Sequence, residues 1–139
     1  MVVLLLALMA QAPGSAVVSV ARGEFSGVSE ARQVVARTPA EWDAVWKAHA
    51  PGQTAPAVNL STEMVAAIFL GTRPTGGYRV EITATRQDGD TLVIEYTERQ
   101  PGAGDIVTQV QTSPFHLARV PRHAGPVRFL KQSNSGRTQ

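Results

Sequence analysis

The chain has 139 residues, of which 43% are hydrophobic, and its 13 basic and 11 acidic residues give a formal net charge of +2. This length suits one domain with a sizeable core, and the hydrophobic content argues against a disordered chain. The small net charge gives no basis for nucleic-acid binding. Because there is no cysteine, we expect no disulfide, no thiol nucleophile, no cysteine-bound metal and no lipid anchor on an N-terminal cysteine.

Residues 1–16 have the features of a secretory signal segment. The apolar run over residues 2–10 is too short to span a bilayer. Residues 10–12 fit a small-x-small cleavage pattern, and residues 14–16 are a second candidate because Pro13 hinders the first. No basic side chain precedes the run, so a buried first strand is the alternative. We expect an extracytoplasmic (periplasmic or secreted) protein without stable membrane insertion.

One helix is predicted after short strands over residues 17–28 and 33–36. Thr38 is a suitable N-cap, Pro39 suits the first helical position, and Glu41 completes a capping box with Thr38. One helical face then carries four large side chains, Trp42, Val45, Trp46 and His49. We expect the tryptophans to anchor the core. His49 closes the helix, where a cation suits the dipole.

The rest of the chain predicts mostly antiparallel strands. Residues 64–70 are continuously apolar, which indicates a central strand covered on both faces. A hairpin turn at Asp88-Gly89-Asp90 separates alternating strands over 78–84 and 92–96, and further strands are predicted over 106–112, 115–120 and 127–130. The fold class is therefore α+β, mainly β, with antiparallel sheets in a sandwich or partly open barrel and one amphipathic helix. The domain spans residues 17–130, and residues 131–139 form a flexible tail.

The segment Arg73-Pro74-Thr75-Gly76-Gly77-Tyr78 is the candidate partner-binding loop. Pro74 fixes its own φ and restricts Arg73, while Gly76 and Gly77 permit positive φ. The loop therefore has a defined conformation, and Arg73 is its only charged side chain. These properties favour recognition over catalysis. The alternative is a tight turn followed by a core tyrosine.

Nothing in the sequence indicates catalysis. His49, His116 and His123 lack zinc-site spacing, and there is no nucleophile elbow. Glu95 and Glu98 point to opposite faces of a strand. We expect no enzyme activity, no metal and no cofactor. The basic residues near the C-terminus indicate a solvated strand face: Arg119, Arg122, Arg128 and Lys131.

Taken in order, several segments resemble the protease complex subunit PrcB C-terminal domain family. They are residues 41–49, 59–69, the block Gly71-Thr72-Arg73-Pro74-Thr75-Gly76-Gly77-Tyr78, the Pro101-Gly102 loop, residues 112–116 and residues 126–129. The glycine-rich block is the most specific of these. The family comprises small secreted or lipid-anchored accessory proteins, named after a subunit of a bacterial surface protease complex. The resemblance implies a non-catalytic role in binding or stabilising a protease, with no tether carried over because this chain lacks cysteine.

A narrower resemblance links residues 73–78 to the Asn-Pro-Thr-Thr-Gly-Tyr loop of chagasin-like cysteine-peptidase inhibitors, which have an immunoglobulin-like fold. It covers six residues, and no second inhibitory loop is found. Two alternatives to the accessory role therefore stay open. One is a peptidase inhibitor that uses this loop. The other is a small-ligand domain with a pocket lined by Arg73, Tyr78 and Glu95.

Overall fold

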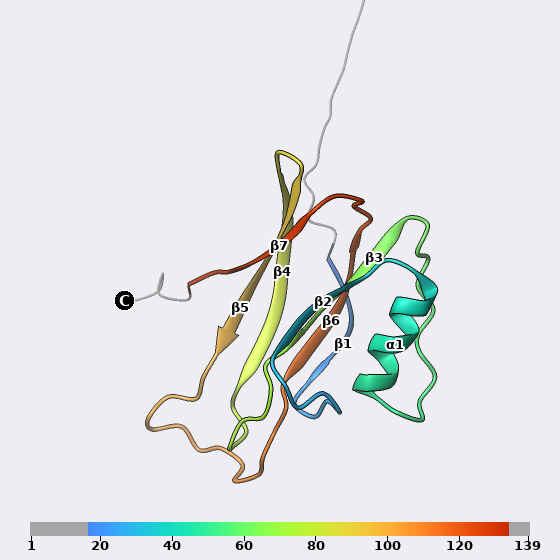
Figure 1. Ribbon diagram of the computed structural model, residues 1–139. Helices are drawn as coiled ribbons and strands as arrows, with labels where there is room; N and C mark the ends of the chain where they lie inside the picture. Colours follow the sequence, from blue (N-terminus) through green and yellow to red (C-terminus); the bar gives the residue numbers. More distant parts are fainter. Residues whose placement is uncertain (1–16, 134–139) are drawn as a thin grey trace, which may run out of the picture.

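The computed structural model describes residues 17–133, so the predicted signal segment and residues 134–139 of the predicted tail lie outside the described residues. Within this range one helix and seven strands follow each other along the chain (Figure 1). Their bounds are β1 Val18–Gly23, β2 Arg32–Ala36, α1 Pro39–His49, β3 Glu63–Phe69, β4 Arg79–Asp88, β5 Thr91–Arg99, β6 Phe115–Pro121 and β7 Val127–Lys131.

The elements form three layers. A four-stranded antiparallel sheet of order β1-β6-β3-β2 lies between α1 on one face and a three-stranded sheet of order β4-β5-β7 on the other (Figure 1). The mainly-β α+β class with one amphipathic helix is confirmed, and the two sheets form a sandwich that does not close into a barrel. β7 pairs with β5 in parallel, so the expectation of antiparallel strands fails at the C-terminal edge.

Strand β3 explains why residues 64–70 carry no polar side chain. Successive side chains of a strand point to opposite faces. Met64 and Ile68 belong to the core between the two sheets, whereas Val65 and Phe69 belong to the core under the helix. Because β3 is central in its sheet and both faces are covered, an uninterrupted apolar run is the only pattern that suits it.

The helix begins as its sequence predicts. Thr38 Oγ1 accepts a hydrogen bond from the Glu41 N–H at 3.1 Å, and Glu41 Oε1 accepts one from the Arg37 N–H at 2.7 Å. The indole N–H groups of Trp42 and Trp46 donate to carbonyls in the loop after the helix. The tryptophans therefore fill the core and hold this loop against the helix.

Three strand predictions need correction. β1 is shorter than predicted and ends at Gly23. The pairing of β4 shifts in register between Ile82 and Ala84, which changes which side chains of β4 face the core after that point. Thr85 is therefore buried, and Ala84 is only partly buried. Residues 106–112 form no strand: Ile106 is fully exposed, and only Thr112 makes a bridge, with Arg73. A segment in which apolar and polar residues alternate does not form a strand when no neighbouring strand is available to pair with it.

His116 on β6 connects the two sheets. Its Nδ1 accepts a hydrogen bond from the Ile82 N–H of β4 at 2.8 Å, so Nε2 carries the proton and donates to Ser19 Oγ of β1 at 3.0 Å. Burial, reinforced by the positive charge of Arg22 and opposed by Glu81, lowers the pKa of His116 from 6.5 to about 4. His116 is therefore neutral near pH 7 and has a structural role.

Candidate functional site

Three loops meet at one end of the sandwich: residues 24–30, 71–78 and 100–114, together called the loop end below. Figure 1 shows the loops around β3, β4, β5 and β6 at the bottom of the molecule, opposite the β4–β5 hairpin. Ser113 N–H donates to Glu24 O at 2.7 Å, and Thr72 N–H donates to Ser29 O at 3.1 Å. Segments far apart in sequence thus form one continuous surface.

The 71–78 loop is held by backbone pairing to the 100–114 loop. Arg73 and Thr112 exchange two hydrogen bonds, of 2.8 and 2.9 Å, and Gly76 N–H donates to Thr108 O at 3.0 Å. The hydroxyl of Thr112, which is 2% exposed, donates to Thr75 O at 2.9 Å. The sequence did not reveal that residues 108–112 support the 71–78 loop. Their alternation of apolar and polar residues predicts a strand, whereas the structure has only a short bridge there.

Gly77 is the glycine that the loop requires. Its φ is +95°, and a Cβ there would lie 2.9 Å from Val107 Cγ1 and 3.0 Å from Pro101 Cβ. Both Gly76 and Gly77 permit positive φ, and Gly77 is the one of the two that adopts it. The close packing of Gly77 fixes the 71–78 loop against the 100–114 loop.

Replacing Gly77 with alanine is expected to destabilise the protein by about 2 kcal/mol, because a strained backbone and a steric clash add together. Gly89→Ala is the matched control. Its φ is +61° and a Cβ there meets nothing within 4 Å, so only the backbone cost of about 1 kcal/mol is expected. Urea unfolding measures both. Equal losses would show that Gly77 serves only a local turn.

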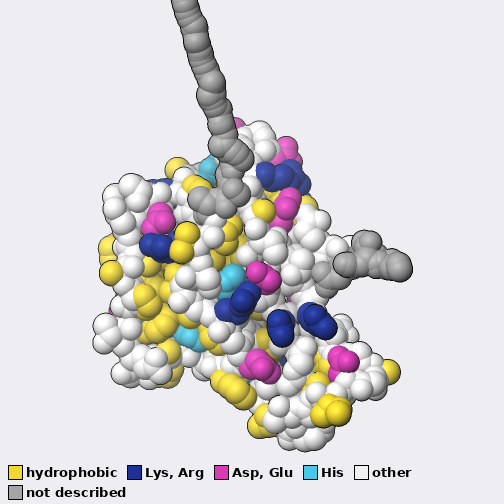
Figure 2. Space-filling view, turned by 180° about the vertical axis from the view of Figure 1, so that it is seen from behind, with side chains coloured by type: hydrophobic (Ala, Val, Ile, Leu, Met, Phe, Trp, Pro, Cys, Tyr) yellow, Lys and Arg dark blue, Asp and Glu magenta, His cyan; other side chains and the backbone are white. Residues whose placement is uncertain are grey.

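The loop end exposes several apolar side chains among polar ones. Phe25 is 67% exposed, Ile106 is fully exposed and Val110 is 42% exposed. Pro74 is also exposed, while Arg73 and Thr75 are half-buried. Seen from behind, yellow hydrophobic side chains protrude at this end of the molecule (Figure 2). Large apolar side chains exposed close together on hydrogen-bonded loops are typical of a protein contact.

Tyr78 lies outside both cores. It precedes β4, is half-buried, and its ring lies 5.7 Å from the guanidinium carbon of Arg73. The interpretation of Tyr78 as an ordinary core residue that starts a strand is therefore wrong. The tyrosine instead supports Arg73 by a cation–π contact.

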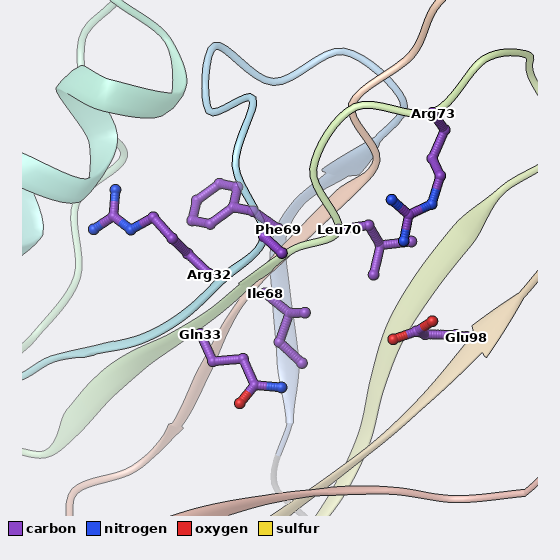
Figure 3. A pocket seen from close by; sticks show the side chains of 8 residues that line it. Arg32, Gln33, Ile68, Phe69, Leu70, Arg73 and Glu98 are labelled. Carbon is purple, nitrogen blue, oxygen red and sulfur yellow. The ribbon is translucent and has the colours of Figure 1, made fainter.

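A cleft of about 280 Å³ opens beside the loop, between the two sheets. Arg73 and Glu98 face the same space, whereas Arg32 points to the other side (Figure 3). Ile68 and Leu70 of the core between the sheets also line this cleft, and so does Phe69, although Phe69 belongs to the core under the helix. Neither Tyr78 nor Glu95 lines this cleft, and Glu95 is bound to Arg86 at 2.8 Å. The pocket expected from Arg73, Tyr78 and Glu95 is not the one that the loop borders.

The histidines hold segments together. His49 is 7% exposed and its Nδ1 lies 2.9 Å from Ser26 Oγ, which ties the 24–30 loop to the helix. Burial lowers the pKa of His49, which opposes the cation that would suit this end of the helix. His123 Nε2 lies 2.9 Å from Asp90 O. Among residues 17–133, no three His, Asp or Glu side chains are grouped to hold a metal ion.

The basic residues near the C-terminus bind separate partners. Arg119 pairs with Glu63, Arg128 with Asp88 and Lys131 with Glu98. Arg122 donates to two backbone carbonyls. These groups are engaged individually, as expected for a solvated face. β7 includes Lys131, and Gln132 N–H donates to Tyr96 O at 2.7 Å, so ordered structure continues to the start of the predicted tail.

Comparison with known proteins gives one match. Residues 64–121 match the family model described as PrcB C-terminal. The matched segment runs from β3 through β6 and includes the 71–78 and 100–114 loops. No curated protein and no solved structure matches the chain. In the described part of the chain, no helix is both long and apolar enough to cross a membrane.

Proposed function

Because residues 64–121 match the family model described as PrcB C-terminal, we propose that this protein is a non-catalytic accessory protein that binds a protein of a protease complex. The loop end is its contact surface. The observation that carries the proposal is the double backbone pairing of Arg73 with Thr112. This pairing fixes the family's most specific loop on the surface before any partner arrives. A prefixed loop loses little conformational entropy on binding, so more of the interaction energy remains as affinity.

The side-chain chemistry supports a binding role. His116 joins the sheets, His49 holds the 24–30 loop and His123 lies within hydrogen-bonding distance of a backbone carbonyl. Each histidine thus has a structural contact, and within residues 17–133 these contacts are to a serine hydroxyl or to the backbone, not to a carboxylate as a general base would have. The signal-like segment over residues 1–16 supports an extracytoplasmic location for the protein.

Arg73→Ala combined with Thr75→Ala is expected to weaken capture of the partner by about tenfold or more. The free energy of unfolding should fall by only about 1 kcal/mol, because both side chains are half-buried and bind locally. The measurement is affinity capture of the protein's partner from the host's envelope and medium, with mass spectrometry to identify it and a binding curve for each variant.

The matched control changes the opposite end of the sandwich. Gln87→Ala and Arg128→Ala alter exposed side chains near the β4–β5 hairpin and should leave capture unchanged. Recovery of no protease or protease-associated protein under any growth condition would contradict the accessory role. Equal capture by the loop variant and the wild type would instead show that the 71–78 loop is only a scaffold.

A peptidase-inhibitor function is the second candidate. It is favoured by the similarity of residues 73–78 to the inhibitory loop of chagasin-like proteins and by the gathering of three loops at one end. It predicts inhibition of a papain-like cysteine peptidase, which the Arg73→Ala and Thr75→Ala double variant would lose. A complete lack of inhibition by the wild type, measured with excess protein, removes this candidate and leaves the accessory role untouched.

A further inference from the structure

Two neighbouring arginines, Arg79 at the start of β4 and Arg99 at the end of β5, have no partner within residues 17–133. Most basic side chains of the described residues are engaged: Arg22 with Glu81, Arg86 with Glu95, Arg119 with Glu63, Arg128 with Asp88 and Lys131 with Glu98. Among residues 17–133, Arg79 and Arg99 make no side-chain hydrogen bond, ion pair or ring contact. Arg32 is the other arginine of residues 17–133 whose side chain makes no such interaction.

The sheet register places Arg79 and Arg99 directly opposite each other. They are cross-strand partners of the antiparallel β4–β5 pair, so both side chains project from the same face. Both are exposed. Like charges in this arrangement destabilise a sheet. The nearest acid on the same face is Glu81, two residues along β4, and Arg22 already binds it at 3.1 Å.

The pair also lies beside the loop end. Arg79 directly follows Tyr78 of the 71–78 loop, and Arg99 directly precedes the 100–114 loop. Two guanidinium groups held at adjacent strand positions present a row of N–H donors that fits paired carboxylates. Repulsion between the two arginines is relieved when an anionic group comes between them.

We propose that Arg79 and Arg99 form a binding site for an acidic segment of the protein partner, with adjacent carboxylates seated between the two guanidinium groups. This proposal rests on the proposed function, because it assigns a chemical character to the partner that the loop end contacts. The exposed apolar side chains of the loop end provide contact area, and the arginine pair selects partners with acidic residues next to that contact.

The test uses a labelled hexaglutamate peptide as the probe, a hexaglutamine peptide as its uncharged counterpart, and fluorescence anisotropy on the full chain. The wild type should bind hexaglutamate and not hexaglutamine, with affinity falling as salt rises to about 0.15 M. Arg79→Ala combined with Arg99→Ala should weaken hexaglutamate binding by about tenfold or more, as expected for losing charge-assisted hydrogen bonds. The melting temperature should stay unchanged or rise, because repulsion is removed.

Two further variants distinguish a specific binding site at Arg79 and Arg99 from non-specific attraction of the acidic peptide to positive charge. Arg32→Ala removes an equally unpaired arginine from β2 and should leave hexaglutamate binding within about twofold. Arg79→Lys combined with Arg99→Lys keeps the charge but lacks the planar fork, so binding should fall to an intermediate level.

Three results would overturn the inference: no binding of hexaglutamate, an equal loss in the Arg32→Ala variant, or displacement of the peptide by an equal concentration of inorganic phosphate, which would indicate a site for free oxyanions. This assay needs no natural partner. Failure here with successful capture of a protease refutes only the acidic-segment site. Hexaglutamate binding without any captured protease refutes the proposed function.

Discussion

Replacing Phe69 with alanine is expected to lower the free energy of unfolding by about 3–5 kcal/mol, measured by urea unfolding. Phe69 is 2% exposed, lies on the central strand β3 and belongs to the core under the helix. Its ring lies 6.2 Å from the His49 ring, measured between centroids. Both sheet faces are covered at this point, so the structure has little freedom to close the cavity. A loss of this size is a large part of the stability of an ordinary domain.

Phe25→Ala is the matched control for this large loss. Phe25 has the same side chain but is 67% exposed at the loop end, so its removal should cost under about 0.5 kcal/mol. The same variant should weaken partner capture, because an exposed aromatic side chain is a common anchor of protein interfaces. Similar stability losses in Phe25→Ala and Phe69→Ala would contradict the assigned core.

The second large effect is a loss of stability in acid caused by His116. Its pKa is lowered from 6.5 to about 4 in the folded protein, chiefly by burial. The unfolded chain therefore binds a proton on this side chain more readily. Its contribution to stability is fully present above the unfolded pKa of 6.5 and is lost as pH falls towards 4. The difference corresponds to about 3 kcal/mol. His49, whose pKa burial also lowers, acts in the same direction.

Urea unfolding between about pH 7 and pH 4 measures this dependence. In His116→Asn an amide oxygen can accept the hydrogen bond from the Ile82 N–H but does not titrate. We expect this variant to be less stable at neutral pH and to have a flatter stability curve on acidification. Carboxylates titrate equally in both proteins, so the difference between the two curves isolates His116. Parallel curves would show that His116 has the same pKa in the folded and the unfolded protein, and would contradict the effect of burial.

Much of the fold could be predicted from the sequence where local chemistry decides the outcome. The helix was predictable because Thr38, Pro39 and Glu41 satisfy its first N–H groups in a recognisable order. The hairpin at Gly89 and the central strand were predictable for the same reason, since turn chemistry and an unbroken apolar run each have few alternatives.

The remaining features depend on contacts that no local pattern records. The parallel pairing of β7 with β5 and the shift between Ile82 and Ala84 are set by how the sheets pack. The 106–112 segment alternates like a strand but finds only Arg73 to pair with. The candidate loop was recognisable from its glycine and proline residues, whereas its support by Thr112 and the facing pair of Arg79 and Arg99 appear only when distant strands are placed side by side.

Site-specific photo-crosslinking tests most directly whether the loop end contacts the partner. A photoreactive phenylalanine analogue is placed at Ile106, which is fully exposed at the loop end, and in a second protein at Gln87, which is exposed on the opposite hairpin. Each is irradiated in the host's envelope fraction, and the crosslinked proteins are identified by mass spectrometry. The proposed contact surface predicts a protease or protease-associated protein crosslinked from position 106 and not from position 87. Crosslinking of that protein from position 87 alone would contradict it.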